Sequence, residues 1–430
     1  MNIGFSIVSI SNNAGYGYFY NKSKQSFFAW DSSSIKCYLD KIIESSTLVY
    51  VTDSKKVYSS LSFLGIDYLS KVQLFDSKAF LNVYKNSLNI DLYELAIKYY
   101  KIDNKIENER IKKIWNIQVE KNNWQYIPNY LIDIYLSKDA AIAYRFGEHF
   151  FNIKLEEYQK KYLQFLQEFI LYLCFLEQNG MTERKTMNRV VPNYHYDRVV
   201  TGRIVNTEPF CYQTSNNQKI LDTYQSRFGD KGIILIADWS NIEFRVAAAL
   251  AEEKLDNEKK DPYVLMGKIW LKKNEISDLE RTFMKTFVQS ALYGYEKLNS
   301  DILFKLYPKI KIFRDKILAE VKKTKKLTTI FGKTRYFSKD DNFETKALNT
   351  ICQSTVASLC MKGIIEIQKE FRNQKLQSVP LPYVKYDSFS VDCLIEERKK
   401  VEEAIKMALI TKTIPEPWKK FVEFEVKISA

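Results

Sequence analysis

Two acidic residues directly follow or interrupt apolar runs that have the length of buried strands. The run GIILIA (232–237) leads into Asp238, and Asp387 stands in YDSF (386–389) between two apolar-rich runs. Carboxylates at adjacent strand ends can hold two Mg²⁺ ions, because hard cations prefer oxygen ligands. Such a pair of ions lowers the pKa of an attacking hydroxyl and neutralises a pentacovalent phosphate. A single strand-end Asp is more often a helix cap or turn residue, so the hypothesis depends on the pair.

A third stretch, LERTFMKTFVQSALYGYE (279–296), carries polar residues at a helical spacing. Arg281, Lys285, Gln289 and Tyr293 follow one another at intervals of four. On a helix these positions share one slowly drifting face. Two cations, an amide and an aromatic ring on this face could cradle a triphosphate and stack on a base. Taken alone, the stretch fits an ordinary solvated helix face better.

The elements that must position these residues can be outlined from the pattern of apolar residues. Residues 1 to about 105 read as alternating strands and helices, and about 106 to 190 as amphipathic helices. After VVTGRIV (199–205) strands and helices alternate to the end, and Asp387 is expected at the tip of a hairpin. The sequence therefore predicts an α/β protein in which two strands bring the acids together.

Composition limits the classes of protein that this chain could be. It has 430 residues, 46% of them hydrophobic, and a formal net charge of +13, which suits a polyanionic partner such as nucleic acid as well as a plainly charged surface. Six cysteines form no Cys-x-x-Cys pair and only two histidines are present, which argues against a zinc site. We expect no signal peptide and no membrane span.

Six segments form an ordered series along the chain. They are YHYDRVVTGRI (194–204), DWSNIEFR (238–245), RTFMKTFVQSALYG (281–294), KKLTTIFGKTRYF (325–337), ALNTICQSTVAS (347–358) and KYDSF (385–389). In this order they resemble the motifs of the family A DNA polymerases, the class of bacterial DNA polymerase I. Each segment is weak alone, and the ordered series over about residues 190 to 395 makes the resemblance specific.

The resemblance implies a role for each matching position. Asp238 and Asp387 would be the metal-binding aspartates, the Trp239 carbonyl would complete one metal's shell, and Lys285 would join the two acids as a catalytic residue. The remaining expected site residues would bind the nucleotide (Arg281, Lys285, Gln289, Tyr293 and Glu243) or the primer–template (Arg203, Asn349 and Gln353). Glu243 would be the steric gate, bonding Tyr293 and crowding a ribose 2′-hydroxyl. The implied reaction is template-dependent addition of dNTPs to a primer 3′-hydroxyl by two metal ions.

Several positions depart from the family pattern. Gln289 stands where the family has Phe or Tyr, Tyr386 where it has His and Ser388 where it has Glu, and PFCYQ (209–213) replaces a Pro-Asn-Leu-Gln-Asn segment. Some departures are closer to single-subunit RNA polymerases, so a polymerase of that kind, or one with relaxed sugar choice, is one alternative. The retained Glu243 favours DNA synthesis. A non-catalytic nucleic-acid-binding accessory protein is the other alternative.

The resemblance also implies a domain plan, a right hand of palm, fingers and thumb behind an exonuclease-like α/β domain. We expect a degenerate 3′–5′ exonuclease-like domain at 1–105, a helical thumb or connecting region at 106–200, and palm and fingers at 201–430, with the fingers at about 255–345. The strand bearing Asp-x-Glu would precede the chain, Val57 stands at a helix Asp position, and no Tyr-x-x-x-Asp is evident, so we expect no proofreading. An unrelated α/β domain is the alternative.

Cofactor and partners follow from the same resemblance. We expect two Mg²⁺ ions, with Mn²⁺ as a substitute, and primer–template DNA and dNTPs as substrates. A processivity or replisome protein is an expected further partner, and the enzyme is expected to be a monomer without membrane contact. We place it in a bacterial cytoplasm, or in the host cytoplasm if a phage encodes it. A short chain without proofreading acids leans toward a phage or mobile element.

Overall fold

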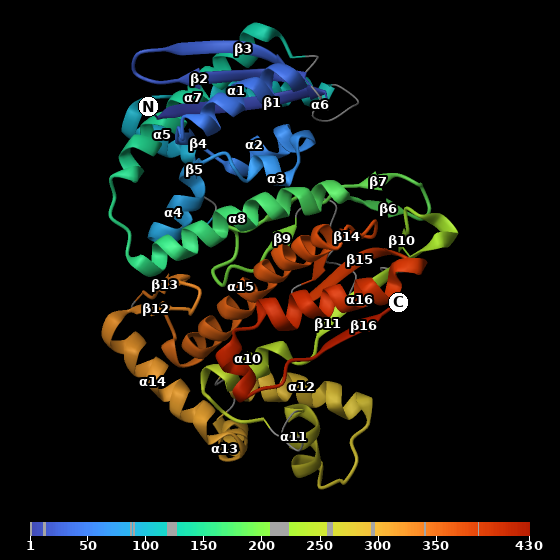
Figure 1. Cartoon of the computed structure of the whole chain (residues 1–430). Helices are drawn as coiled ribbons and strands as arrows, with labels where there is room; N and C mark the ends of the chain where they lie inside the picture. The colour runs from blue at the N-terminus through green and yellow to red at the C-terminus, as the bar shows by residue number, and fades with distance from the viewer. Residues whose placement is uncertain are drawn as a thin grey trace. The chain divides into compact units, whose positions relative to one another are not determined.

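The computed structural model describes residues 2–11, 14–86, 88, 91–117, 127–206, 223–255, 261–293, 297–338, 341–385 and 387–430 (Figure 1). Tyr386 and the segment 209–213, two of the positions that depart from the family pattern, lie outside these ranges. The chain forms two compact units, Met1–Phe175 and Leu176–Ala430. No helix in the described ranges is both long and apolar enough to cross a bilayer.

The N-terminal unit is built on a five-stranded mixed sheet. Its strands are β1 (Ile3–Ser11), β2 (Ala14–Tyr20), β3 (Gln25–Asp31), β4 (Val49–Val51) and β5 (Leu74–Asp76), in the spatial order β3-β2-β1-β4-β5. β1 is the central strand, antiparallel to β2 and parallel to β4. Strands β3 and β5 were not predicted from the sequence.

Eight helices accompany this sheet in the described part of the unit. They are α1 (Ser32–Glu44), α2 (Ser54–Leu61), α3 (Ile66–Leu69), α4 (Ser77–Lys85), α5 (Leu92–Tyr100), α6 (Lys105–Ile117) and α7 (Asn129–Phe151), followed by α8 (Glu157–Asn179), which crosses into the second unit. The residue that caps the N-terminus of each of the first four helices is Asp or Gly. The Asp side chains accept hydrogen bonds from the first-turn amides of α1, α2 and α4.

Helix α7 packs directly on the sheet. Its Ile132 and Leu136 lie in one apolar cluster with Val8 of β1. Gly4 and Gly147 permit the close approach, because a Cβ on Gly4 would lie 2.1 Å from the Ala140 carbonyl oxygen and one on Gly147 2.1 Å from the Tyr50 ring. The compact unit thus continues past residue 105, to Phe175, and the predicted exonuclease-like domain at 1–105 stays a prediction.

The second unit is centred on a four-stranded antiparallel sheet. Its strands are β14 (Val379–Lys385), β15 (Ser388–Leu394), β11 (Gly232–Trp239) and β16 (Val426–Ser429), in this spatial order. Side chains alternate between its faces. Ile234 and Ile236 pack with Leu381 on one face, while Trp239 meets Phe389 edge-to-face on the other, with ring centroids 5.2 Å apart.

Helices and small sheets complete this unit. The helices are α10 (Ile242–Leu250), α11 (Pro262–Leu271), α12 (Asp278–Leu292), α13 (Lys297–Leu306), α14 (Pro308–Thr324), α15 (Phe343–Asn373) and α16 (Arg398–Lys406). The short strands are β6 (Met181–Glu183), β7 (Arg189–Val190), β8 (Tyr194–His195), β9 (Val205–Asn206), β10 (Tyr224–Gln225), β12 (Lys326–Thr328) and β13 (Thr334–Tyr336). Helix α15 is mostly buried and packs against α10 and α14, so a long central helix supports the region that follows β11.

Candidate active site

The pairing of β11 with β15 brings the two predicted acids to the same end of the sheet. Asp238 lies opposite Ser388 in the strand register, directly beside Asp387. The Ser388 hydroxyl donates a hydrogen bond to Asp238 Oδ1 at 2.9 Å, and the Trp239 amide lies 3.4 Å from the Asp387 carbonyl oxygen as a weak donor. Ser388, which the sequence analysis treated only as a departure, thus contacts one of the acids.

The two carboxyl groups oppose each other electrostatically. Burial, followed by the nearby charge of Asp238, raises the pKa of Asp387 to about 7, and the Lys285 ammonium acts in the opposite direction. A divalent cation between the two acids would relieve this repulsion. The donors are carboxylate oxygens, so the pair fits Mg²⁺ or Mn²⁺. Within the described ranges, no group of three or more His, Cys, Asp or Glu residues is arranged to hold a metal.

Trp239 contributes to this site through its main chain. Its indole is 1% exposed and lies in the core against Phe389. A carbonyl ligand from this residue remains a prediction of the family resemblance.

Glu243 is held by two side chains at the start of α10. Its Oε2 atom accepts a hydrogen bond from the Tyr293 hydroxyl at 2.8 Å. Its Oε1 atom forms an ion pair with Arg203 Nη2 at 2.8 Å. The residue is 9% exposed, so both contacts are largely shielded from water. The structure thus fixes the Glu243 side chain in place, and its role as a sugar gate remains a prediction.

Helix α12 carries three of the four residues that the sequence put on one face. A capping box between Ser277 and Glu280 starts the helix. Lys285 is exposed and Gln289 is half-buried on this helix. Tyr293 follows the last residue of α12 as its C-cap, and its amide donates to the Gln289 carbonyl oxygen at 3.1 Å, so it continues the helix that carries the other three residues.

Arg281 is enclosed by residues that the sequence analysis missed. Its Nε and Nη2 atoms each lie 2.9 Å from Asp261 Oδ2, and Nη2 also donates to Asn241 Oδ1 at 3.2 Å. Its guanidinium carbon lies 5.4 Å from the centroid of the Tyr263 ring. An Asp-Pro pair at 261–262 is a helix-start signal, and nothing in that signal separates a cap that also holds an arginine from an ordinary cap.

The predicted primer–template residues lie on helix α15 and in the loop before β9. Asn349 and Gln353 are half-buried positions one turn apart on α15, whose neighbouring positions are largely buried. Arg203 follows Gly202, which has a φ of +81° and lies against the Lys333 side chain. Burial lowers the pKa of Lys333 to about 8. Arg203 contacts Glu243, so the structure joins a predicted DNA contact to the predicted sugar gate.

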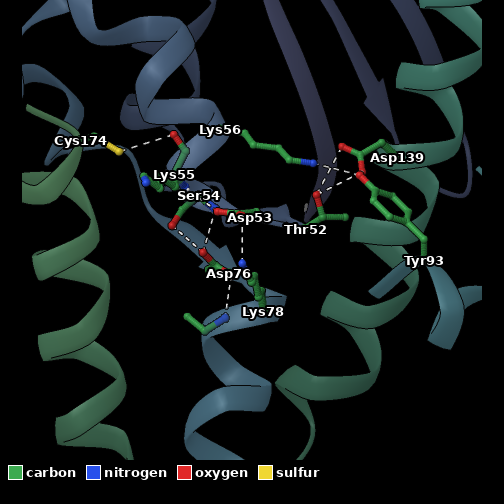
Figure 2. Close-up of polar contacts among 11 residues, drawn as sticks. Thr52, Asp53, Ser54, Lys55, Lys56, Asp76, Lys78, Tyr93, Asp139 and Cys174 are labelled. Atoms are coloured by element: carbon green, nitrogen blue, oxygen red, sulfur yellow. Dashed lines mark hydrogen bonds and ion pairs between the residues drawn. The ribbon is translucent and has the colours of Figure 1, made fainter. Parts of the chain in front are cut away.

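The N-terminal unit has a separate polar cluster (Figure 2). Asp139 on α7 is 4% exposed and accepts hydroxyl hydrogen bonds from Ser6 (2.6 Å), Thr52 (3.1 Å) and Tyr93 (2.8 Å). Lys56 donates to the Tyr93 hydroxyl at 3.0 Å. Burial would lower the pKa of Lys56, but the surrounding tyrosines and Asp139 raise it well above its usual range. Three hydroxyls and a nearby ammonium therefore satisfy this carboxylate.

Asp139 also corrects the sequence analysis. With Tyr135 it forms a Tyr-x-x-x-Asp spacing that we did not find from the sequence. Val57, assigned to a helix Asp position, is 5% exposed and lines a small apolar cavity with Phe5. The neighbour Lys56, a cation, points to the cluster instead (Figure 2).

A second pair of acids lies beside this cluster (Figure 2). Asp76 is fully buried and accepts bonds from the Ser54 amide and hydroxyl, at 2.7 and 2.6 Å, and from the Ala79 amide at 2.8 Å. Burial and the charge of Asp53 raise the pKa of Asp76 to about 6. Asp53 itself caps α2 and forms an ion pair with Lys78 at 3.6 Å. Asp53 thus caps α2, and Asp76 both caps α4 and binds Ser54 at the start of α2, so the two acids connect the N-termini of these helices.

Comparison with known proteins places these features in a family. The model of the family described as DNA polymerase family A matches residues 148–430, two thirds of the chain. The matching part thus contains every predicted site residue of the second unit.

Curated relatives match about half of the chain. DNA polymerase I of Borreliella burgdorferi is 24% identical over 259 residues, which are 52% of this chain and 28% of that protein. The DNA polymerase of Bacillus phage SP01 is 25% identical over 266 residues, 51% of this chain and 28% of that protein. The matched region thus spans little more than a quarter of the length of these relatives.

A solved structure is similar over the whole chain. It is the POL domain of Pol1 from M. smegmatis in complex with DNA primer-template and dNTP. The TM-score is 0.64 at 12% identity, with 100% of this chain and 95% of that chain covered. At this identity the similarity establishes the fold.

Proposed function

Because the chain belongs to DNA polymerase family A, we propose that it is a DNA-directed DNA polymerase that adds dNTPs to a primer 3′-hydroxyl by a two-metal mechanism. The observation that carries the proposal is the register of β11 with β15, which places Asp238 opposite Ser388 and so beside Asp387. Two strand-end carboxylates and a cation from a neighbouring helix are the groups that phosphoryl transfer requires.

In this proposal the chain's own residues position the reactants. Asp238 and Asp387 hold the two divalent ions, which when bound acidify the primer hydroxyl and neutralise charge on the phosphates. Ser388 fixes the carboxylate of Asp238 through its hydroxyl. Lys285 and Arg281 bind the triphosphate from α12, and in-line attack releases pyrophosphate. Removing either acid abolishes the chemistry and leaves the chain's surplus of positive charge, which suits DNA binding.

We propose that the enzyme prefers deoxyribonucleotides. Glu243 supports this because Tyr293 and Arg203 fix it from two sides, so that it forms a rigid wall rather than a mobile side chain. A rigid wall beside the sugar excludes a 2′-hydroxyl by steric clash and by leaving its hydrogen bonds unmade.

We propose that the N-terminal unit is a degenerate exonuclease-like domain without proofreading activity. Its strongest support is the Asp139 cluster, where hydroxyl donors from Ser6, Thr52 and Tyr93 occupy both carboxylate oxygens. A carboxylate that is saturated by donors, with Lys56 near it, is a poor ligand for a divalent cation. This cluster therefore suits a structural role.

Further proposals rest on the family alone. We propose that the enzyme acts as a monomer on primer–template DNA in the cytoplasm of a bacterium or of an infected host. A processivity protein is the expected partner. Light scattering of the purified protein with and without primed DNA tests the oligomeric state, and a dimer in both samples would contradict it.

Primer extension tests the proposed function and separates it from the alternatives. The purified chain is given primed DNA, Mg²⁺ and either dNTPs or NTPs, with a paired or a mismatched primer 3′ end. We expect extension with dNTPs, little with NTPs, and no removal of the mismatched nucleotide. DNA binding without any extension would indicate an accessory protein, and strong extension with NTPs would indicate an RNA polymerase-like or relaxed-sugar enzyme.

A further inference from the structure

Arg281 is fixed on three sides in a way that the family motif does not describe. Asp261 Oδ2 accepts a hydrogen bond from Nε and forms an ion pair with Nη2, Asn241 Oδ1 accepts a hydrogen bond from Nη2, and the guanidinium lies over the Tyr263 ring. The side chains of Arg281 and Asp261 are 32% and 28% exposed. The site is therefore reachable by a ligand, while the arginine has a single defined orientation.

The holding residues come from two helix starts. Asp261 caps α11 with Oδ1, which accepts from the amides of Tyr263 (3.1 Å) and Val264 (3.2 Å), and this leaves Oδ2 for Arg281. One carboxylate thus serves both the helix and the arginine.

Asn241 connects the arginine to the end of β11. It has a left-handed backbone, with φ of 53°, at the start of α10, three residues after Asp238. Its side chain makes no cap hydrogen bond to that helix, and its oxygen accepts from Arg281. The guanidinium is thereby tied to the strand end that carries the catalytic acid.

We propose that Asp261 and Asn241 are positioning residues that present Arg281 to the incoming triphosphate. An arginine offers two bidentate edges, one made by Nε and Nη2 and the other by Nη1 and Nη2. Asp261 lies at the first edge and Asn241 accepts from Nη2, and no hydrogen bond within the described ranges uses Nη1. The Nη1 group is thus left for phosphate oxygens, and the acid orients the arginine without competing for it.

This inference rests on the proposed function, so templated synthesis by the unmodified chain is established first. The test is then D261N, because Asn caps helices as well as Asp and keeps α11 intact. We expect the KM for dNTPs to rise about 10-fold, the loss of one charge-assisted contact, with kcat changed by less than about 3-fold. An unchanged or lower KM would overturn the inference, and a lower KM would show that Asp261 competes with the triphosphate.

Two further variants distinguish positioning from a structural effect. In R281A the KM rises further, and adding D261N to R281A changes nothing more, because Asp261 acts only through the arginine. N241G keeps the left-handed backbone, removes the Oδ1 acceptor, and raises the KM about 3-fold. A full D261N effect in the R281A background would refute the positioning role.

A matched control is D31N, which replaces another capping aspartate. Asp31 caps α1 through the amides of Ser33 and Ser34 and has no ion pair within the described ranges. We expect no change in KM. A KM increase in D31N equal to that in D261N would assign the effect to helix capping and overturn the inference. Failure of the unmodified chain to synthesise DNA is a separate outcome, since it refutes the proposed function before any variant is compared.

Discussion

Removing the Tyr293 hydroxyl should reduce sugar discrimination, and it should do so only through Glu243. The hydroxyl is buried and donates to the carboxylate at 2.8 Å. A hydrogen bond to a charged acceptor contributes about 1.5–3 kcal/mol of stability. Only the part of this free energy that keeps Glu243 in position affects the discrimination between dNTPs and NTPs. Taking about 1.4 kcal/mol for that part gives a tenfold loss of discrimination in Y293F, which keeps the ring.

Truncating Glu243 should have a larger effect. E243A removes both the wall and its two contacts with Tyr293 and Arg203. We expect discrimination against NTPs to fall at least about 100-fold, equivalent to about 2.7 kcal/mol. E243Q retains the volume, so it should keep discrimination within about threefold of the unmodified enzyme if steric exclusion dominates.

The assay is single-turnover incorporation of dCTP and CTP opposite the same template guanine, giving the ratio of kcat/KM values. In a double-mutant cycle, E243A with Y293F should be no less selective than E243A alone. Fully additive losses would refute the coupling of Tyr293 to sugar choice through Glu243. Unchanged discrimination in E243A would refute the gate itself. Y130F, at a tyrosine that is 67% exposed, is the control for hydroxyl removal.

Three further predictions follow from the described contacts. Between pH 5 and 7 the raised pKa of Asp76, about 6 against an ordinary value of 3.8, makes folding less favourable as the pH rises. D53N keeps the α2 cap and lowers that pKa, so protection of the Ala79 amide against hydrogen exchange should fall less over this range; an unchanged pH dependence would contradict the assignment. S388A should lower kcat about 3- to 10-fold and weaken Mn²⁺ binding measured by calorimetry, because Asp238 loses a positioning donor, and unchanged affinity would contradict that role. Affinity for primed DNA should fall more than about tenfold between 50 and 200 mM KCl, and a flat salt dependence in a binding titration would argue against a phosphate-binding basic surface.

The sequence pattern was sufficient to select Asp238 and Asp387 as the two candidate acids. An apolar run ending in Asp238 and a turn bearing Asp387 predicted neighbouring strand ends, and the register of β11 with β15 brings these residues side by side. The pairing itself could not be derived from either segment alone, because 149 residues separate them (387 − 238). The ordered motifs supplied it by resemblance.

Contacts made by capping residues were beyond the sequence pattern. Asp261 reads as an ordinary helix start, and only the packing of α11 against α12 reveals that its second oxygen holds Arg281. The spacing of four placed Tyr293 on the face of α12, and in the structure this residue is the C-cap of that helix.

The extent of the N-terminal compact unit, to Phe175, was not evident from the sequence for a similar reason. The sequence pattern from about 106 to 190 predicts amphipathic helices, and amphipathicity shows that a helix has a buried face without showing what covers it. The apolar face of α7 packs on the N-terminal sheet through Ile132 and Leu136, which a thumb assignment did not anticipate. Asp139 was overlooked because it lies within this helix.

Templated single-nucleotide addition tests the central claim most directly. The purified chain is mixed with primed DNA, Mg²⁺ and one dNTP at a time, and both the primer length and released pyrophosphate are measured. We predict addition only of the dNTP complementary to the template, with one pyrophosphate per nucleotide, and none in D238A or D387A although both still bind the DNA. Binding of primed DNA by the unmodified chain without nucleotide addition or pyrophosphate release would contradict the account.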